Sequence, residues 1–147
     1  MLSGLEAGFT RKEKTDFTPH YEAHRQQMDA NGGDTDAMIR LRQRIHQYPE
    51  FAFQEFQTQK LLSETLESFG VEKKNIRKCA STGLVVDIMG KGAAAKNTKG
   101  CKLIALRTDL DALPMPENNH SLPYKSKTKF AHMCGHDGHM ACLMAAA

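Results

Sequence analysis

The feature that most constrains the fold of this chain is a cluster of metal-binding side chains close to its C-terminal end. Three of the seven histidines and one of the four cysteines lie within residues 132–139. In an extended backbone, which alternates its side chains between two faces, His132, Cys134 and His136 would point the same way. We therefore expect this segment to form a strand or a loop. It lies just before the alanine-rich stretch 140–147, where we expect a helix to begin.

The crowding of these side chains favours an open, catalytic metal site over a closed, structural one. Thiolates and neutral imidazoles suit zinc and similar divalent ions. A structural zinc site needs four ligands, commonly as two separated pairs, and no second pair occurs in the sequence. A single histidine or cysteine is more often packed or exposed than a ligand, but four donors together favour metal binding. A self-contained structural zinc domain remains the weaker alternative.

The composition is that of an ordinary globular chain and argues against several other classes of protein. Its 147 residues are 40% hydrophobic and 25% charged, which allows a sizeable core. The net charge is +3, and the eight Lys and Arg residues between 73 and 102 have no aromatic neighbours, so we expect no nucleic-acid binding. No stretch predicts a membrane span or a secretory signal. The four scattered cysteines suggest a reduced, cytoplasmic protein.

Local patterns predict helices in the first half of the chain. Residues 1–33 are polar and end in Asn-Gly-Gly, so they form an N-terminal extension, either a frayed helix or a family-specific addition. A helix is expected over 34–48, with Asp34 as its cap, and a second over 55–69, followed by Gly70. Apolar stripes at helical spacing predict the core residues Met38, Leu41, Ile45 and Tyr48 in the first helix and Leu62, Leu66 and Phe69 in the second.

After the second helix the apolar pattern changes to one typical of strands. Residues 82–90 are short, β-branched and bounded by glycine, and residues 101–107 are apolar enough for a central strand. The two strands, joined by the flexible segment 91–100, could form a hairpin. The order of helix, helix, strand, strand, loop and helix predicts an α/β fold with helices packed on a sheet.

Two carboxylates follow the second predicted strand. Asp109 and Asp111 lie at its carboxyl end, where open α/β sheets place their ligand sites. A carboxylate can bind a metal or hold a ligating histidine in place. Alternatively, the two residues simply begin a turn before Pro114, and their spacing does not choose between these interpretations.

Several motifs, in the same order, resemble the aminoacylase family of metallopeptidases. The nearest branch contains the hippurate hydrolases and the hydrolases of IAA–amino acid (auxin) conjugates. The matching motifs are Arg-x-Asp-x-Asp-Ala-Leu-Pro at 107–114, Cys-Gly-His-Asp-Gly-His at 134–139, Leu-Arg-Gln-Arg-Ile-His-Gln-Tyr-Pro-Glu at 41–50, and Tyr-Lys-Ser-Lys at 124–127. The resemblance runs from about residue 36 to residue 147.

The resemblance implies a metal site and assigns residues to it. Cys134 corresponds to a thiolate ligand and His136 to a neighbouring ligand. Asp109 and Asp111 match the acidic pair of the family, one of which orients a ligand or supports catalysis. Other matching residues are expected to support the site or the fold instead: His132 and His139 beside the ligands or the substrate, and His46, Pro49 and Glu50 in packing and at a helix end.

The resemblance also implies an activity, the metal-dependent hydrolysis of the amide bond of small N-acyl amino acids. Two divalent ions, zinc or manganese, activate a water and polarise the scissile carbonyl, and a glutamate serves as general base. This sequence lacks the paired glutamates, the later histidine ligands and the dimerisation domain of the family. We therefore expect residues 34–147 to be the incomplete N-terminal portion of a sheet-and-helix metallopeptidase catalytic domain, with at most a partial metal site. The alternative is a catalytically inactive metal-binding or regulatory fragment.

Overall fold

The computed structural model covers most of the chain. It describes residues 18–30, 32–90 and 103–147. Three parts of the predictions lie outside the described residues: the first half of the N-terminal extension (1–17), the loop 91–100, and the first two residues of the predicted strand 101–107.

The chain divides into two units, Met1–Gly33 and Asp34–Ala147. In the first unit, helix α1 spans Thr18–Ala30, and Arg25 and Asp29 form an ion pair of 3.8 Å across one of its turns. The second unit contains the remaining elements and all of the residues that the sequence assigns to a site. None of the helices in the described ranges has the length and apolar character needed to cross a bilayer.

The two helices predicted in the second unit are confirmed. Helix α2 spans Thr35–Gln47, and the Asp34 carboxylate accepts a hydrogen bond of 2.8 Å from the Ala37 amide, as a cap should. Helix α3 spans Phe56–Ser68 and ends before Gly70, whose φ of +90° suits a residue without a Cβ. The buried members of the two stripes are Met38, Leu41, Ile45, Leu62 and Leu66, whereas Tyr48 and Phe69 remain half exposed.

The sheet has two antiparallel strands, and one of them was not predicted. After the short 3₁₀ helix η1 (Lys73–Asn75), strand β1 spans Ile76–Cys79 and pairs with β2, Gly83–Val86. The predicted hairpin between 82–90 and 101–107 is not found among the described residues, because β2 pairs with β1 and residues 103–107 form no strand. The exposed side chains of β1 carry no apolar alternation that would mark it as a strand.

The described part of the second predicted strand forms no strand and does not lie centrally. Residues 103–107 have no strand pairing, and Leu103, Ile104 and Leu106 are 95%, 82% and 64% exposed. An apolar segment adopts a central-strand position only when neighbouring strands cover it. The described residues supply no such neighbour here, so this segment presents an apolar surface to solvent.

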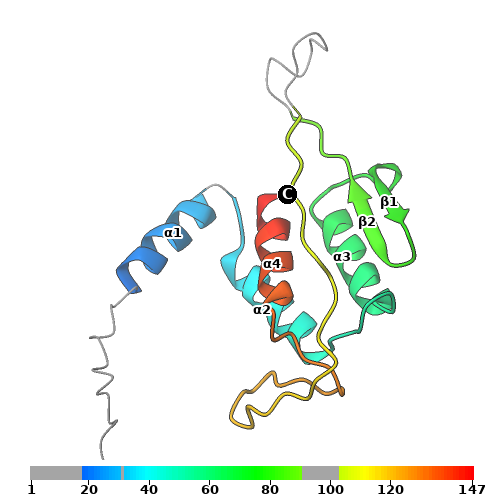
Figure 1. Ribbon diagram of the computed structural model, residues 1–147. Helices are drawn as coiled ribbons and strands as arrows, with labels where there is room; N and C mark the ends of the chain where they lie inside the picture. The colour runs from blue at the N-terminus through cyan, green and yellow to red at the C-terminus, as the bar shows by residue number, and fades with distance from the viewer. Residues whose placement is uncertain (1–17, 31, 91–102) are drawn as a thin grey trace, which may run out of the picture. The chain divides into compact units, whose positions relative to one another are not determined.

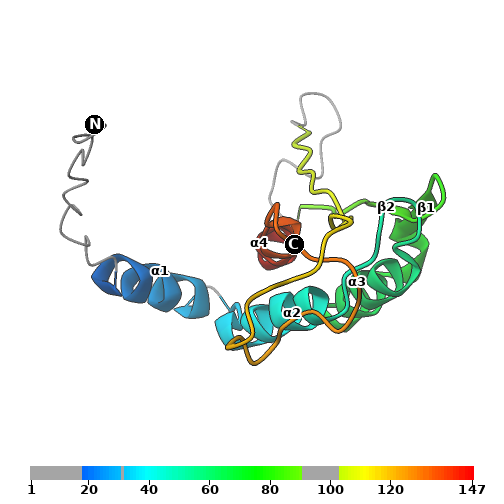
Figure 2. The ribbon, with the colours of Figure 1, turned by 60° about the horizontal axis from the view of Figure 1, so that its bottom comes forward.

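Helix α4 (His136–Ala146) begins earlier than expected and includes the end of the histidine cluster. It packs along α2, and α3 lies against β2, as Figures 1 and 2 show. The core between α2 and α4 contains Ile45, Ala131, Met140 and Met144, each at most 3% exposed. This arrangement of helices beside a small antiparallel sheet agrees with the predicted sheet-and-helix class.

Candidate metal centre

Backbone pairings bring the acidic pair next to the histidine cluster. The Ala112 amide donates to the Glu50 carbonyl, at 2.8 Å, immediately after Asp111. Leu113 and Ala131 then form an antiparallel bridge with two backbone hydrogen bonds of 3.0 and 3.1 Å. This bridge closes the long loop between them, so that the chain returns to the acidic pair just before α4 begins.

His136 contacts both members of the acidic pair. Its Nδ1 lies 2.9 Å from the backbone carbonyl oxygen of Asp111 and 3.3 Å from the carboxylate of that residue. Its Nε2 lies 3.9 Å from the carboxylate of Asp109. Because carbonyl and carboxylate oxygens only accept hydrogen bonds, the proton of a neutral His136 ring belongs on Nδ1. The lone pair on Nε2 is then available to an ion, which is how metal-binding histidines are usually held.

Cys134 lies in a turn, and the expected alternation of side chains does not occur. Residues 133 and 134 form a turn, and Gly135 has a φ of +84°, so the segment before α4 is not extended. His132 is buried, whereas Cys134 is exposed as a free thiol. Among the described residues, no three His, Cys, Asp or Glu side chains come close enough to hold an ion together.

The donor set nevertheless fits a divalent metal. Among the described residues, no hydrogen-bond donor or carbonyl contacts the Nε2 of His136, and the Asp109 carboxylate lies 3.9 Å from it. A thiolate, an imidazole and a carboxylate are the ligand types that zinc accepts. Among the described residues, the two donors that lie together are His136 Nε2 and the Asp109 carboxylate, with the Asp111 carbonyl 2.9 Å from the other ring nitrogen, and Cys134 completes no three-ligand cluster with them.

A buried charged network lies directly behind this site and was not predicted. One carboxylate oxygen of Asp137, Oδ2, accepts hydrogen bonds from Arg42 Nε at 2.7 Å and from His46 Nδ1 at 2.8 Å. The other ring nitrogen of His46 lies 3.2 Å from Glu117 Oε1. Tyr124 accepts a hydrogen bond of 3.0 Å from Arg42, and its ring packs under the guanidinium. The sequence held one signal, because Arg42 and His46 are four residues apart and so share a helix face.

The two buried carboxylates of this network lie on either side of the His46 ring. Its Nδ1 is 2.8 Å from Asp137 Oδ2, and its Nε2 is 3.2 Å from Glu117 Oε1. Burial opposes ionisation of Asp137, but the hydrogen bond from His46 and the charge of Arg42 outweigh it, and the pKa of Asp137 lies below its usual value. Burial also opposes the ionisation of Glu117. The hydrogen bonds from the Ser126 amide and from His46 outweigh it, and the pKa of Glu117 lies below its usual value. Both carboxylates are therefore ionised at neutral pH.

His132 is buried beside this network without a hydrogen bond. It is 4% exposed, and neither ring nitrogen has a partner among the described residues. Burial, with smaller contributions from nearby charges, lowers the pKa of His132 to about 4, so its ring is neutral at pH 7. The expectation that His132 and His139 support the ligands or the substrate stays a prediction; His139 is exposed, with its ring 6.0 Å from that of His136.

Two residues of the N-terminal signature have the structural roles that were predicted. Pro49 is fully buried. The Glu50 carboxylate accepts hydrogen bonds from the amides of Gln57 and Thr58 and from the Thr58 hydroxyl, at 2.7 to 3.1 Å. It therefore satisfies free amides in the first turn of α3 and places a negative charge at that helix end. His46, from the same signature, belongs instead to the charged network.

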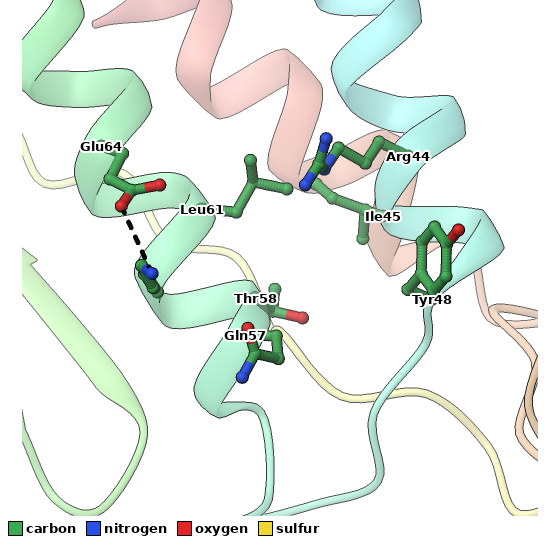
Figure 3. Close-up of a pocket in the computed structure, with 8 residues that line it drawn as sticks. Arg44, Ile45, Tyr48, Gln57, Thr58, Leu61 and Glu64 are labelled. Carbon is green, nitrogen blue, oxygen red and sulfur yellow. Dashed lines mark ion pairs between the residues drawn. The ribbon is translucent and has the colours of Figure 1, made fainter.

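A pocket of ≈ 330 Å³ lies between α2 and α3 and is separate from the candidate site (Figure 3). Leu61 of α3 points across it towards Ile45 of α2, and Lys60 pairs with Glu64 at its rim. None of the residues assigned to the metal site lines it. The pocket therefore has no part in the chemistry of the candidate metal site.

Comparison with known proteins shows that this chain is similar to one group of proteins, the M20 peptidases and related hydrolases. Residues 105–147 match Peptidase family M20/M25/M40. The chain is 42% identical over 113 residues to thermostable carboxypeptidase 1 of Saccharolobus solfataricus, a match that covers 76% of this chain and 26% of that protein. It is 42% identical over 109 residues to the hippurate hydrolase of Campylobacter jejuni, with 74% and 26% covered.

A solved structure gives the same result. The YXEP protein of Bacillus subtilis, described as a dinuclear metal binding peptidase from the M20 family, superposes with a TM-score of 0.63 and 34% identity over 74% of this chain and 28% of that one. These matches confirm the resemblance drawn from the motifs: the chain is a relative of the M20 peptidases. It spans about a quarter of the length of the relatives it matches.

Proposed function

We propose that this chain contributes part of the metal site of an amidohydrolase that cleaves the amide bond of N-acyl amino acids. The single observation that carries the proposal is the geometry of His136, whose Nδ1 is held by the Asp111 carbonyl at 2.9 Å. That contact leaves Nε2 free to bind, with the Asp109 carboxylate 3.9 Å away. The hippurate hydrolase of Campylobacter jejuni supports the substrate class, because hippurate is an N-acylated glycine.

Each residue of the site has a distinct role in this proposal. His136 and Cys134 are metal ligands, Asp111 orients the His136 ring, and Asp109 is a further ligand or fixes the ligands electrostatically. The ions, zinc or manganese in a pair, supply Lewis-acid polarisation of the scissile carbonyl and activation of a water. The YXEP relative, a dinuclear metal binding peptidase, supports a pair of ions.

The metal ligands can be tested by loading the purified chain with cobalt(II). A thiolate bound to cobalt gives a sulfur-to-metal charge-transfer band, and we expect this band in the parent chain. Cys134→Ser should abolish it, and His136→Gln should weaken the affinity for cobalt. Cys142→Ser is the matched control, since Cys142 is also an exposed free thiol. Absence of the band from the parent, or its persistence in Cys134→Ser, would contradict the assignment.

A second candidate function is a catalytically inactive metal-binding or regulatory module. It is favoured by the absence of three converging donors among the described residues. The two functions differ in turnover: hippurate is incubated with purified 1–147 and added manganese or zinc, and release of glycine is measured. Hydrolysis that disappears in Cys134→Ala supports the amidohydrolase. Tight metal uptake without any hydrolysis supports the inactive module.

A further inference from the structure

The charged network behind the candidate metal centre joins helix α2 to the first turn of helix α4. Asp137 is the second residue of α4 and directly follows His136 in the sequence. Its side chain is 1% exposed and reaches back to Arg42 and His46, which lie one turn apart on α2. The two helices are therefore connected by hydrogen bonds at the point where α4 presents the candidate ligand.

Apart from the contact of His136 Nδ1 with the Asp111 carbonyl, the start of α4 has no side-chain cap among the described residues. The residue before the helix is Gly135, which offers no side-chain cap and has a φ of +84°. The backbone at such an end is free to change direction unless something else holds it. The two hydrogen bonds to Asp137 Oδ2 supply that constraint from the α2 side.

The network is itself held in place from outside α4. Glu117 contacts the far nitrogen of His46 at 3.2 Å, and its other carboxylate oxygen accepts from the Ser126 amide at 2.7 Å. Tyr124 contacts Arg42 through both its hydroxyl and its ring. These contacts fix the positions of Arg42 and His46. The hydrogen bonds of Arg42 and His46 to Asp137 Oδ2 in turn fix the Asp137 side chain.

Stability alone is a poor explanation for this arrangement. Taking charged groups out of water is costly, and replacing a buried ionic cluster by well-packed apolar residues is often neutral or stabilising. Asp137, His46 and Glu117 are all buried, at 1%, 5% and 5% exposure. Directional hydrogen bonds between charged groups do, however, fix geometry more tightly than apolar contacts.

We propose that Arg42, His46 and Asp137 are positioning residues for the candidate metal centre. They set the direction from which α4 presents His136, and with it the turn that carries Cys134. The inference rests on the proposed function, because it concerns the same site. Residues that orient metal ligands typically change metal affinity on the order of 10- to 100-fold when they are replaced.

The test measures cobalt(II) affinity of the full 147-residue chain through the thiolate charge-transfer band. Arg42→Lys keeps the positive charge but removes the Nε donor, and His46→Gln removes one of the two contacts to Asp137 Oδ2. We expect each to weaken cobalt binding by about 10-fold or more. Arg44→Lys is the matched control, with the same substitution on the same helix at an exposed position outside the network, and it should bind as the parent does.

A merely structural role predicts a different pattern. In that case the variants lose stability against urea, but the folded protein, identified by its far-UV circular dichroism, binds cobalt as tightly as the parent. That result overturns the inference. If His46→Gln fails to fold, Arg42→Lys and the milder Tyr124→Phe, which removes only the hydroxyl contact to Arg42, decide the matter.

The failure of this inference differs from the failure of the proposed function. A parent chain without any charge-transfer band rejects the metal site, and the positioning role falls with it. A parent chain with the band, together with folded variants of unchanged affinity, rejects only the positioning role. Weaker binding in Arg42→Lys and His46→Gln, with normal binding in Arg44→Lys, supports both.

Discussion

Mild acid should destabilise this protein through His132. A histidine in an unfolded chain has a pKa of about 6.5, whereas burial lowers the pKa of His132 in the folded protein to about 4. Between these values the unfolded chain binds a proton that the folded protein does not bind. The contribution of a neutral, buried His132 to the free energy of unfolding is therefore fully present above the pKa that this histidine has in the unfolded chain. It is lost as the pH falls towards 4. The loss amounts to about 2 kcal/mol at pH 5 and approaches about 3.4 kcal/mol in stronger acid.

The assay is urea unfolding followed by circular dichroism between pH 7 and pH 5. The free energy of unfolding comes from linear extrapolation at each pH. Asp137 and Glu117 do not contribute to the change over this range, because their lowered pKa values keep both carboxylates ionised there. The matched variant is His132→Gln, which cannot titrate, and His120→Gln serves as a control at an exposed histidine.

The expected result is a difference in slope. The free energy of unfolding of the parent, and of His120→Gln, should fall by about 2 kcal/mol more than that of His132→Gln between pH 7 and pH 5. If the His132→Gln variant keeps the full acid sensitivity of the parent, the burial argument for this histidine is refuted.

Three further predictions concern the fold around the site. Glu50→Gln weakens the cap of α3 and should lower the free energy of unfolding by about 1 kcal/mol, while Glu64→Gln on the same helix should have little effect; thermal unfolding compares them. Ile45→Ala opens a cavity between α2 and α4 and should cost about 2–5 kcal/mol in urea; a cost below 1 kcal/mol would contradict this packing. Ile104→Lys should reduce binding of a hydrophobic dye and leave stability within about 0.5 kcal/mol, whereas a large loss would mean that Ile104 is covered.

The helices were predictable because their signals are local. Asp34 caps α2, and a stripe of apolar residues four or three apart marks its buried face. Gly70 marks the end of α3, because the left-handed conformation there favours glycine. Such signals depend only on neighbours within one or two turns, so no knowledge of the rest of the fold was needed.

The sheet was predicted less well because strand pairing is not local. Residues 83–86 form a strand within the predicted range, but the partner is β1, which has only one partly buried residue and three exposed ones. The apolar run at 103–106 looked central, yet it is exposed among the described residues. Sequence shows that such a segment can be buried, but not which partner buries it.

The candidate site shows the same division. The types of donor at Asp109, Asp111, Cys134 and His136, and the family that arranges them, could be inferred from the motifs. The contact that leaves His136 Nε2 free depends on the Leu113–Ala131 bridge, which joins residues eighteen apart and has no local signal.

Local side-chain patterns thus account for helices α2 and α3, for the Asp34 cap and for the types of donor at the candidate site. The folded chain adds the relations between distant segments: the pairing of β1 with β2, the burial of His132, and the hydrogen bonds from Arg42 and His46 to Asp137. The physical reason is that a helix is specified by interactions over a few residues, whereas burial and charge pairing depend on which segments far apart in the chain come into contact.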